Sequence, residues 1–145
     1  MSRALLDINV LLALLDADHA DHVLAAEWLD REIDDGWASC AITQNGVVRI
    51  MSQARYPSPV APAVVCDLLE RACATDHHEF WPCEISLLDP TVIDRRRLHG
   101  PRQVTDAYLL ALAVRRAGRF VTFDRSVVTA AVTGATAQAL TVLAP

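Results

Sequence analysis

The sequence predicts one α/β domain with a mainly parallel central sheet and helices on both faces of that sheet. Short apolar runs alternate with longer stretches whose apolar residues recur at helical spacing, in the order strand, helices, strand, helices, strand, helix, strand. The chain has 145 residues, of which 52% are hydrophobic, and this is enough for a single compact core. Residues 1–145 are therefore expected to form one domain.

The first strand and the two helices after it are expected in the first quarter of the chain. The strand is predicted at residues 3–6, a mainly apolar run that ends abruptly in the carboxylate of Asp7. Apolar residues at helical spacing predict a helix at residues 9–16, and a broader apolar face predicts a second helix at residues 19–34. Gly36 ends this second helix.

The second strand and its two following helices are expected in the middle of the chain. Residues 37–42 are short and apolar, which favours a buried parallel strand. Thr43 would cap a helix at residues 44–52, and a proline in the first turn would start another helix at residues 62–74. The remaining predicted elements are a short edge strand at 80–83, a helix at 106–117 capped by Thr105, a strand at 119–123 and a final strand at 139–143.

The charge balance excludes some classes of function. The net charge is −5 and the isoelectric point is near 5.4, which argues against a protein that coats nucleic acid through a basic surface. All 13 basic residues are arginine. The absence of lysine excludes a lysine nucleophile and argues against a phosphoacceptor receiver domain, whose pattern requires a lysine.

Cysteine spacing and hydropathy favour a cytoplasmic protein. The four cysteines lack C-x-x-C spacing, which favours free thiols in a reducing cytosol over a zinc site. No apolar run reaches about 18 residues, and Asp7 interrupts the first one. Neither a signal peptide nor a membrane span is expected.

Three aspartates are expected to meet at one edge of the sheet. Asp7 and Asp124 each follow a predicted strand, and Asp106 opens the helix that leads into the strand at 119–123. Parallel strands end at the same edge, so these acids should share one crevice. Two like charges about 4 Å apart repel by about 4 kcal/mol at an effective dielectric constant of about 20. A divalent cation would offset that repulsion, and oxygen-only ligands favour Mg²⁺ or Mn²⁺ over zinc.

Such a site favours hydrolysis of a phosphodiester bond. Bound Mg²⁺ can activate a water molecule and neutralise charge that develops on a phosphoryl oxygen. Asp7 alone has a second interpretation, because aspartate is also a favoured cap before a helix. Together with Asp106 and Asp124, it is better explained as a metal ligand.

Three segments closely resemble the signatures of PIN-domain proteins and, within that family, of the VapC-type toxins of bacterial type II toxin–antitoxin pairs. They are residues 7–12 (DINVLL), 105–113 (TDAYLLALA) and 122–124 (TFD). The resemblance spans nearly the full length. It implies a PIN-like three-layer fold, and a metal-dependent endoribonuclease that cleaves structured RNA such as tRNA or rRNA.

The resemblance also implies ligands and partners. Asp7, Asp106 and Asp124 would hold Mg²⁺ or Mn²⁺, and Asn9 would be a nearby polar support. A cognate protein antitoxin would silence the toxin, commonly by inserting a peptide near the acidic pocket. A homodimer is expected.

Gln44 departs from the family pattern, which usually places a glutamate at this position. The pocket would then carry three formal negative charges, so that metal affinity is lower and a second metal is less favoured. Gln44 could instead hydrogen-bond a metal-bound water. We count it as a candidate catalytic residue.

Arginines near the helix at 106–117 are candidate RNA contacts. Arg96, Arg97 and Arg102 could line the approach to the pocket, because guanidinium groups suit phosphate oxygens. The alternative for residues 94–99 is a solvated helix face. Two other functions stay open for the whole chain: a catalytically weak or silent PIN-like module that binds RNA or a partner, and an RNA-processing PIN nuclease without an antitoxin.

Overall fold

The computed structural model describes residues 2–145 and contains a five-stranded sheet in the order β3-β2-β1-β4-β5, in which every neighbouring pair is parallel. The strands are β1 (Ala4–Leu6), β2 (Trp37–Ser39), β3 (His78–Phe80), β4 (Arg119–Thr122) and β5 (Leu140–Val142). The helices are α1 (Ile8–Leu15), α2 (His22–Glu32), α3 (Ala41–Met51), α4 (Pro62–Cys73) and α5 (Arg102–Arg115). The 3₁₀ turns are η1 (Ile33–Asp35), η2 (Arg95–Arg97), η3 (Thr129–Ala131) and η4 (Ala137–Ala139).

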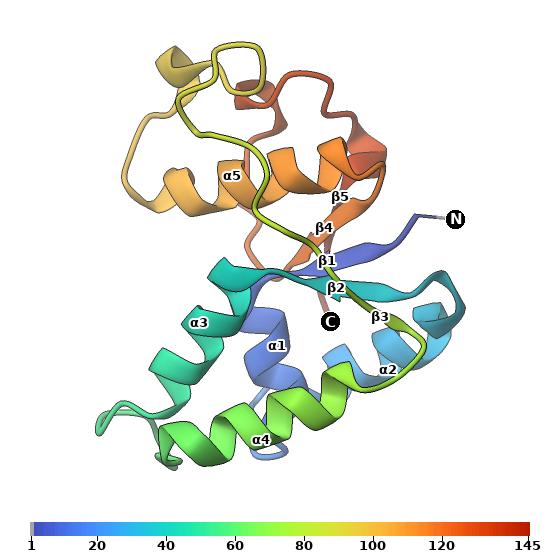
Figure 1. The fold of residues 1–145 in the computed structure, drawn as a ribbon, viewed down its shortest axis with the longest axis vertical. Coiled ribbons are helices and arrows are strands. Elements are labelled where there is room, and N and C mark those ends of the chain that lie inside the picture. The colour runs from blue at the N-terminus through green and yellow to red at the C-terminus, as the bar shows by residue number, and fades with distance from the viewer. Residues whose placement is uncertain (1) are drawn as a thin grey trace.

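Helices cover both faces of the sheet, as the sequence predicts. Figure 1 shows α1 to α4 below the sheet and α5 above it, beside the loop that leads from β3 to α5. The core is divided accordingly, because successive strand side chains point to opposite faces. In β1, Leu5 packs in the cluster with α5, whereas Leu6 packs in the cluster with α1 and α3. The predicted α/β class with helices on both faces is confirmed.

The boundary between β2 and α3 differs from the sequence prediction. The strand ends at Ser39 and the helix begins at Ala41, so the helix takes two residues that were expected in the strand. Cys40 is the cap, and the backbone N–H of Cys40 donates to the Thr43 hydroxyl at 3.0 Å. Thr43 therefore supports the cap from the first turn and is not the cap itself. A short apolar run does not distinguish a strand from a buried first helical turn.

Helix α5 also begins earlier than predicted. It starts at Arg102, directly after Pro101, whose φ of −62° suits a helix start. Thr105 lies inside the helix and is exposed, so its assignment as the cap was wrong. Asp106 consequently lies one turn into the helix, where its side chain projects from the helix flank.

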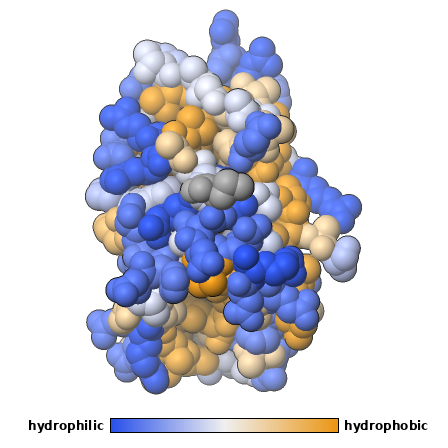
Figure 2. Space-filling view, turned by 90° about the vertical axis from the view of Figure 1, so that its right-hand side faces the viewer, coloured by the Kyte–Doolittle hydropathy of each residue, from blue (hydrophilic) through white to orange (hydrophobic). Residues whose placement is uncertain are grey.

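The edge of the sheet near the N-terminus is polar. Seen from that side, hydrophilic residues cover the middle of the surface and apolar residues gather above and below (Figure 2). Arg3 pairs with Glu79 at 3.6 Å, and Arg119, which starts β4, approaches acids of α2 and η1 at 3.8 Å. These ion pairs lie at the amino ends of the strands. Across residues 2–145, no helix is both long and apolar enough to cross a membrane.

Candidate active site

Asp7 is both a helix cap and a buried carboxylate at the carboxyl end of β1. Its side chain is only 6% exposed. The Ile8 backbone N–H donates to Oδ1 at 2.7 Å, and the Thr122 hydroxyl donates to Oδ2 at 2.6 Å. Burial raises the pKa of Asp7 despite both hydrogen bonds, which act to lower it, and the negative charge of Asp124 raises it further. The two interpretations of this residue are therefore compatible.

Thr122 joins the ends of β1 and β4, and the sequence pattern gave it no role. It is fully buried. Its hydroxyl donates to Asp7 and accepts the backbone N–H of Asp124 at 3.1 Å, while the Asn9 amide nitrogen lies 3.5 Å away. One hydroxyl thus orients groups from both strand ends. Its position two residues before a strand-end acid, on the last residue of the strand, is the signal that could have identified it.

Asp106 carries the clearest electrostatic signature of the site. Burial raises its pKa to about 6, with further contributions from the charges of Asp7 and Asp124 and from a hydrogen bond with Asp124. The pKa of Asp124 is lowered instead, first by hydrogen bonds from the Ser126 hydroxyl and backbone at 2.7 and 2.8 Å. The site therefore disfavours the negative charge of Asp106 and favours that of Asp124. The structure brings the three predicted acids into mutual electrostatic contact.

The residues of this acidic site fit a hard divalent cation. The donors are carboxylate oxygens, and the side-chain oxygen of Asn9 is buried with no hydrogen-bond partner in residues 2–145. Within the same residues, no three His, Cys, Asp or Glu side chains stand close enough to form a ready-made metal cage. Mg²⁺ does not require such a cage, since it is usually held by one or two carboxylates and keeps several waters.

Gln44 is turned toward the end of β2, and it lines a separate cavity between α3 and α4 together with Cys66 and Leu69. Its amide nitrogen donates to the Ser39 hydroxyl at 3.0 Å, and that hydroxyl lies 2.8 Å from His78 Nε2. Burial lowers the pKa of His78, which favours the neutral imidazole that can accept from Ser39. The hydrogen bond of Gln44 is therefore not made to any of the three acids. A catalytic role for this residue stays a prediction.

A glycine allows α3 to approach the start of α1. A Cβ on Gly46 would lie 2.3 Å from the Ile8 Cδ1 atom, so any larger residue would force the Ile8 side chain to move or the two helices to separate. Ile8 immediately follows Asp7. Gly46 therefore lets the first turns of α3, including Gln44, lie near the carboxyl end of β1.

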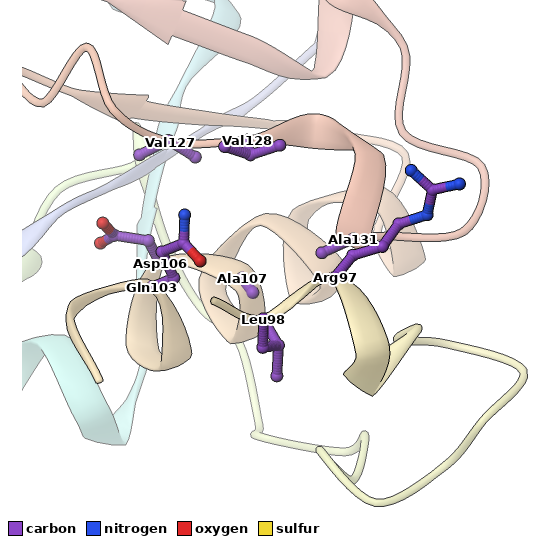
Figure 3. Close-up of a pocket in the computed structure, with 8 residues that line it drawn as sticks. All are labelled: Arg97, Leu98, Gln103, Asp106, Ala107, Val127, Val128 and Ala131. Atoms are coloured by element: carbon purple, nitrogen blue, oxygen red, sulfur yellow. The ribbon is translucent and has the colours of Figure 1, made fainter. Parts of the chain in front are cut away.

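The predicted arginines divide into two groups. Arg102 starts α5, and its positive charge contributes to the lowered pKa of Asp124, so it acts on the acidic site through its charge. Arg96 and Arg97 pair with Asp94 at 3.3 and 3.4 Å, and their side chains are 88% and 59% exposed. Figure 3 shows the Arg97 guanidinium directed away from Asp106. These two arginines lie on a neighbouring exposed turn.

The fold and the site define an α/β protein with a candidate cation site at the carboxyl edge of a parallel sheet. The model of the PIN domain family matches residues 4–132. The chain is 64% identical to ribonuclease VapC44 of Mycobacterium tuberculosis over 141 residues, which cover 97% of this chain and 99% of that relative. It is 38% identical to ribonuclease VapC39 of the same organism over 132 residues, which cover 90% and 95%.

A solved structure agrees with the fold. The chain resembles the crystal structure of VapBC2 from Rickettsia felis bound to a DNA fragment from their promoter, with a TM-score of 0.56 and 11% identity, over 83% of this chain and 87% of that chain. At this identity the likeness concerns the fold alone. The chain belongs to the PIN domain family and, by its near full-length likeness to VapC44, to the VapC-type toxins within it.

Proposed function

We propose that this VapC-type protein is a metal-dependent endoribonuclease that hydrolyses phosphodiester bonds in structured RNA such as tRNA or rRNA. The observation that carries the proposal is the buried Asp7 carboxylate at the carboxyl end of β1, which accepts a 2.6 Å hydrogen bond from Thr122 at the end of β4. Burial first, and then the charges of Asp7 and Asp124, raise the pKa of Asp106 on α5 to about 6. The negative charges of Asp7 and Asp124, which follow β1 and β4, both act on Asp106 of α5, and such a surplus of negative charge suits a divalent cation. The relatives named as ribonucleases support the same reaction.

The residues have separable roles in this proposal. Asp7, Asp106 and Asp124 would hold Mg²⁺ or Mn²⁺, which supplies Lewis acidity and lowers the pKa of a coordinated water. Thr122 fixes the orientation of the Asp7 carboxylate through its 2.6 Å hydrogen bond. Asn9 offers its unpartnered oxygen to a water or ligand in the pocket. Hydrolysis joins the oxygen of water to phosphorus and breaks the bond to the leaving oxygen, which takes up a proton.

RNA would approach along the side of α5. The positive charge of Arg102 acts on Asp124, and its guanidinium group would contact a phosphate near that residue. Arg96 and Arg97 are exposed and can add charge along the same approach. Because the net charge of the chain is −5, binding depends on this local patch.

The biological setting follows from membership of the VapC-type proteins. We propose that the chain acts in the cytosol as a homodimeric toxin and is neutralised by a cognate protein antitoxin. The structural relative whose fold it shares was solved as a VapBC2 assembly, which supports a protein partner. The likeness to VapC proteins also favours this setting over an RNA-processing nuclease without an antitoxin.

A catalytically silent RNA-binding or partner-binding module is the second candidate. The observation that favours it is Gln44, which supplies no carboxylate and donates to Ser39. Calorimetric titration of the purified chain with Mn²⁺ separates the two functions. The nuclease requires metal binding that Asp106→Asn weakens and that Asp30→Asn, an exposed change on α2, leaves unaltered. Absence of binding at millimolar Mn²⁺ would favour the silent module.

A further inference from the structure

Gln103 lies on the same face of α5 as Asp106 and has no role in the site described above. The two residues are three positions apart on the helix, so their side chains are neighbours. Figure 3 shows the Gln103 amide and the Asp106 carboxylate side by side, below the segment that carries Val127. A residue in this position is well placed to contact whatever binds at Asp106.

The orientation of the Gln103 amide is fixed by the loop before α5. The backbone N–H of His99 donates to Gln103 Oε1 at 2.7 Å. A backbone N–H can only donate, so the amide oxygen must face His99 and the amide nitrogen must face the other way. Within residues 2–145 the nitrogen has no hydrogen-bond acceptor, and Figure 3 shows it directed toward Val127 and Val128. Two N–H donors are thus presented beside Asp106.

The space in front of these donors is small and otherwise apolar. It measures about 10 Å³, close to the volume that one water-sized group needs, and Val127, Val128 and Ala131 contribute apolar walls. Arg97 borders it, but its guanidinium is directed away and pairs with Asp94. This space between Gln103 and the apolar walls, called the notch below, therefore suits a single acceptor oxygen and is too small for a nucleobase.

We propose that the Gln103 amide nitrogen donates a hydrogen bond to one oxygen of the RNA backbone at the nucleotide held against Asp106. The oxygen is either a non-bridging phosphate oxygen or a ribose 2′-hydroxyl, both of which accept hydrogen bonds. Gln103 then contributes to substrate affinity, and the His99 contact sets its geometry. This inference rests on the proposed ribonuclease function.

Three variants separate RNA contact from loop anchoring. Gln103→Ala removes both the acceptor for His99 and the two donors. Gln103→Glu keeps the acceptor for His99 and removes the two donors, but it also adds a negative charge. Ala130→Glu supplies a control for that charge, because Ala130 is exposed and adjoins Ala131 at the wall of the notch.

The measurement is binding of a fluorescein-labelled RNA hairpin to the full chain by fluorescence anisotropy in Ca²⁺, with Mn²⁺-dependent cleavage of the same hairpin as a second readout. Gln103→Ala is expected to weaken binding by about 5- to 15-fold, the effect of one hydrogen bond to an RNA oxygen. Gln103→Glu should weaken it at least as much, and Ala130→Glu clearly less. Matching thermal unfolding midpoints would show that the variants fold.

The outcomes discriminate between the mechanisms. A 2′-deoxy version of the hairpin distinguishes the oxygens: the Gln103→Ala effect disappears on it for a 2′-hydroxyl contact and persists for a phosphate contact. If Gln103→Glu binds RNA as tightly as Ala130→Glu does, and only Gln103→Ala loses affinity, Gln103 serves only to anchor the loop at His99. That result would overturn the inference. Wild-type protein that neither binds nor cleaves RNA would overturn the proposed function instead.

Discussion

The substitution Asp106→Asn should stabilise the metal-free protein at neutral pH while removing its response to divalent cations. In the folded chain the pKa of Asp106 is about 6, well above its usual 3.8, because the side chain is half-buried and close to two other carboxylates. An aspartate whose pKa is raised in the folded chain contributes fully to the free energy of unfolding when the pH is below its pKa in the unfolded chain, which is near 4. That contribution is lost as pH rises through 6, because folding then requires a charge that the pocket disfavours.

The magnitude follows from the pKa shift. A shift from 3.8 to about 6 corresponds to about 3 kcal/mol at about 1.36 kcal/mol per pKa unit. Because Asp106 is half-exposed, solvent screening reduces this to about 1–2 kcal/mol. Asparagine keeps a donor for Asp124 and carries no charge, so it resembles the protonated aspartate. At pH 7.5 Asp106→Asn should therefore gain about 1–2 kcal/mol in free energy of unfolding, and the gain should fade toward pH 4.

The assay is urea unfolding of both proteins between pH 4 and pH 8, in EDTA and in Mn²⁺. Saturating Mn²⁺ at about 100 times its dissociation constant should stabilise the wild type by about 2.7 kcal/mol, and Asp106→Asn by much less. Asp30→Asn, on the exposed side of α2, should stay within about 0.5 kcal/mol of wild type throughout. Destabilisation of the metal-free protein by Asp106→Asn at pH 7.5, or an undiminished response to Mn²⁺, would refute the reasoning.

The remaining predictions concern the packing and polarity around the pocket. Thr122→Val removes a buried hydroxyl that has three hydrogen-bond partners. Urea unfolding should show a loss of about 1–3 kcal/mol, and RNA cleavage should fall by more than this loss of stability explains. Unchanged cleavage would exclude an orienting role for Thr122. Gly46→Ala places a Cβ 2.3 Å from Ile8, and thermal unfolding should show a loss of about 1–3 kcal/mol that Ile8→Ala partly restores; additive losses would contradict this contact. Gln44→Glu removes the donor to Ser39 and adds a charge, so calorimetry should show Mn²⁺ binding tighter by up to about tenfold, or about 1.4 kcal/mol; weaker binding would separate Gln44 from the site.

The position of the three acids could be predicted from the sequence because it depends on chain topology. A parallel sheet brings the ends of β1 and β4 to one edge, whatever the loops between them do. Asp7 and Asp124 follow those two strands, and α5 leads into β4. Their convergence needs only the correct order of elements, so errors of several residues at the helix ends did not disturb it.

The orientation of individual side chains could not be predicted in the same way. Gln44 faces Ser39 because a buried hydroxyl on β2 offers it an acceptor, and the sequence does not reveal that β3 places His78 on the other side of that hydroxyl. Thr122 can donate to Asp7 because β1 and β4 are neighbouring strands, which places the two residues side by side. Gln103 depends on a loop contact with His99. The contacts of Ser39 with His78 and of Thr122 with Asp7 join residues far apart in the chain. His99 and Gln103 are close in the chain, and their contact depends on the conformation of the loop before α5.

Mapping the RNA ends that appear in cells after induced expression tests the central claim most directly, because it reports activity and target together. The comparison is between wild type and Asp7→Asn, which keeps an oxygen to cap α1 and removes the charge that the cation site requires. A cation-dependent ribonuclease predicts discrete new RNA ends with the wild type and none with Asp7→Asn at matched protein levels. The same ends with both proteins, or none with the wild type, would contradict it.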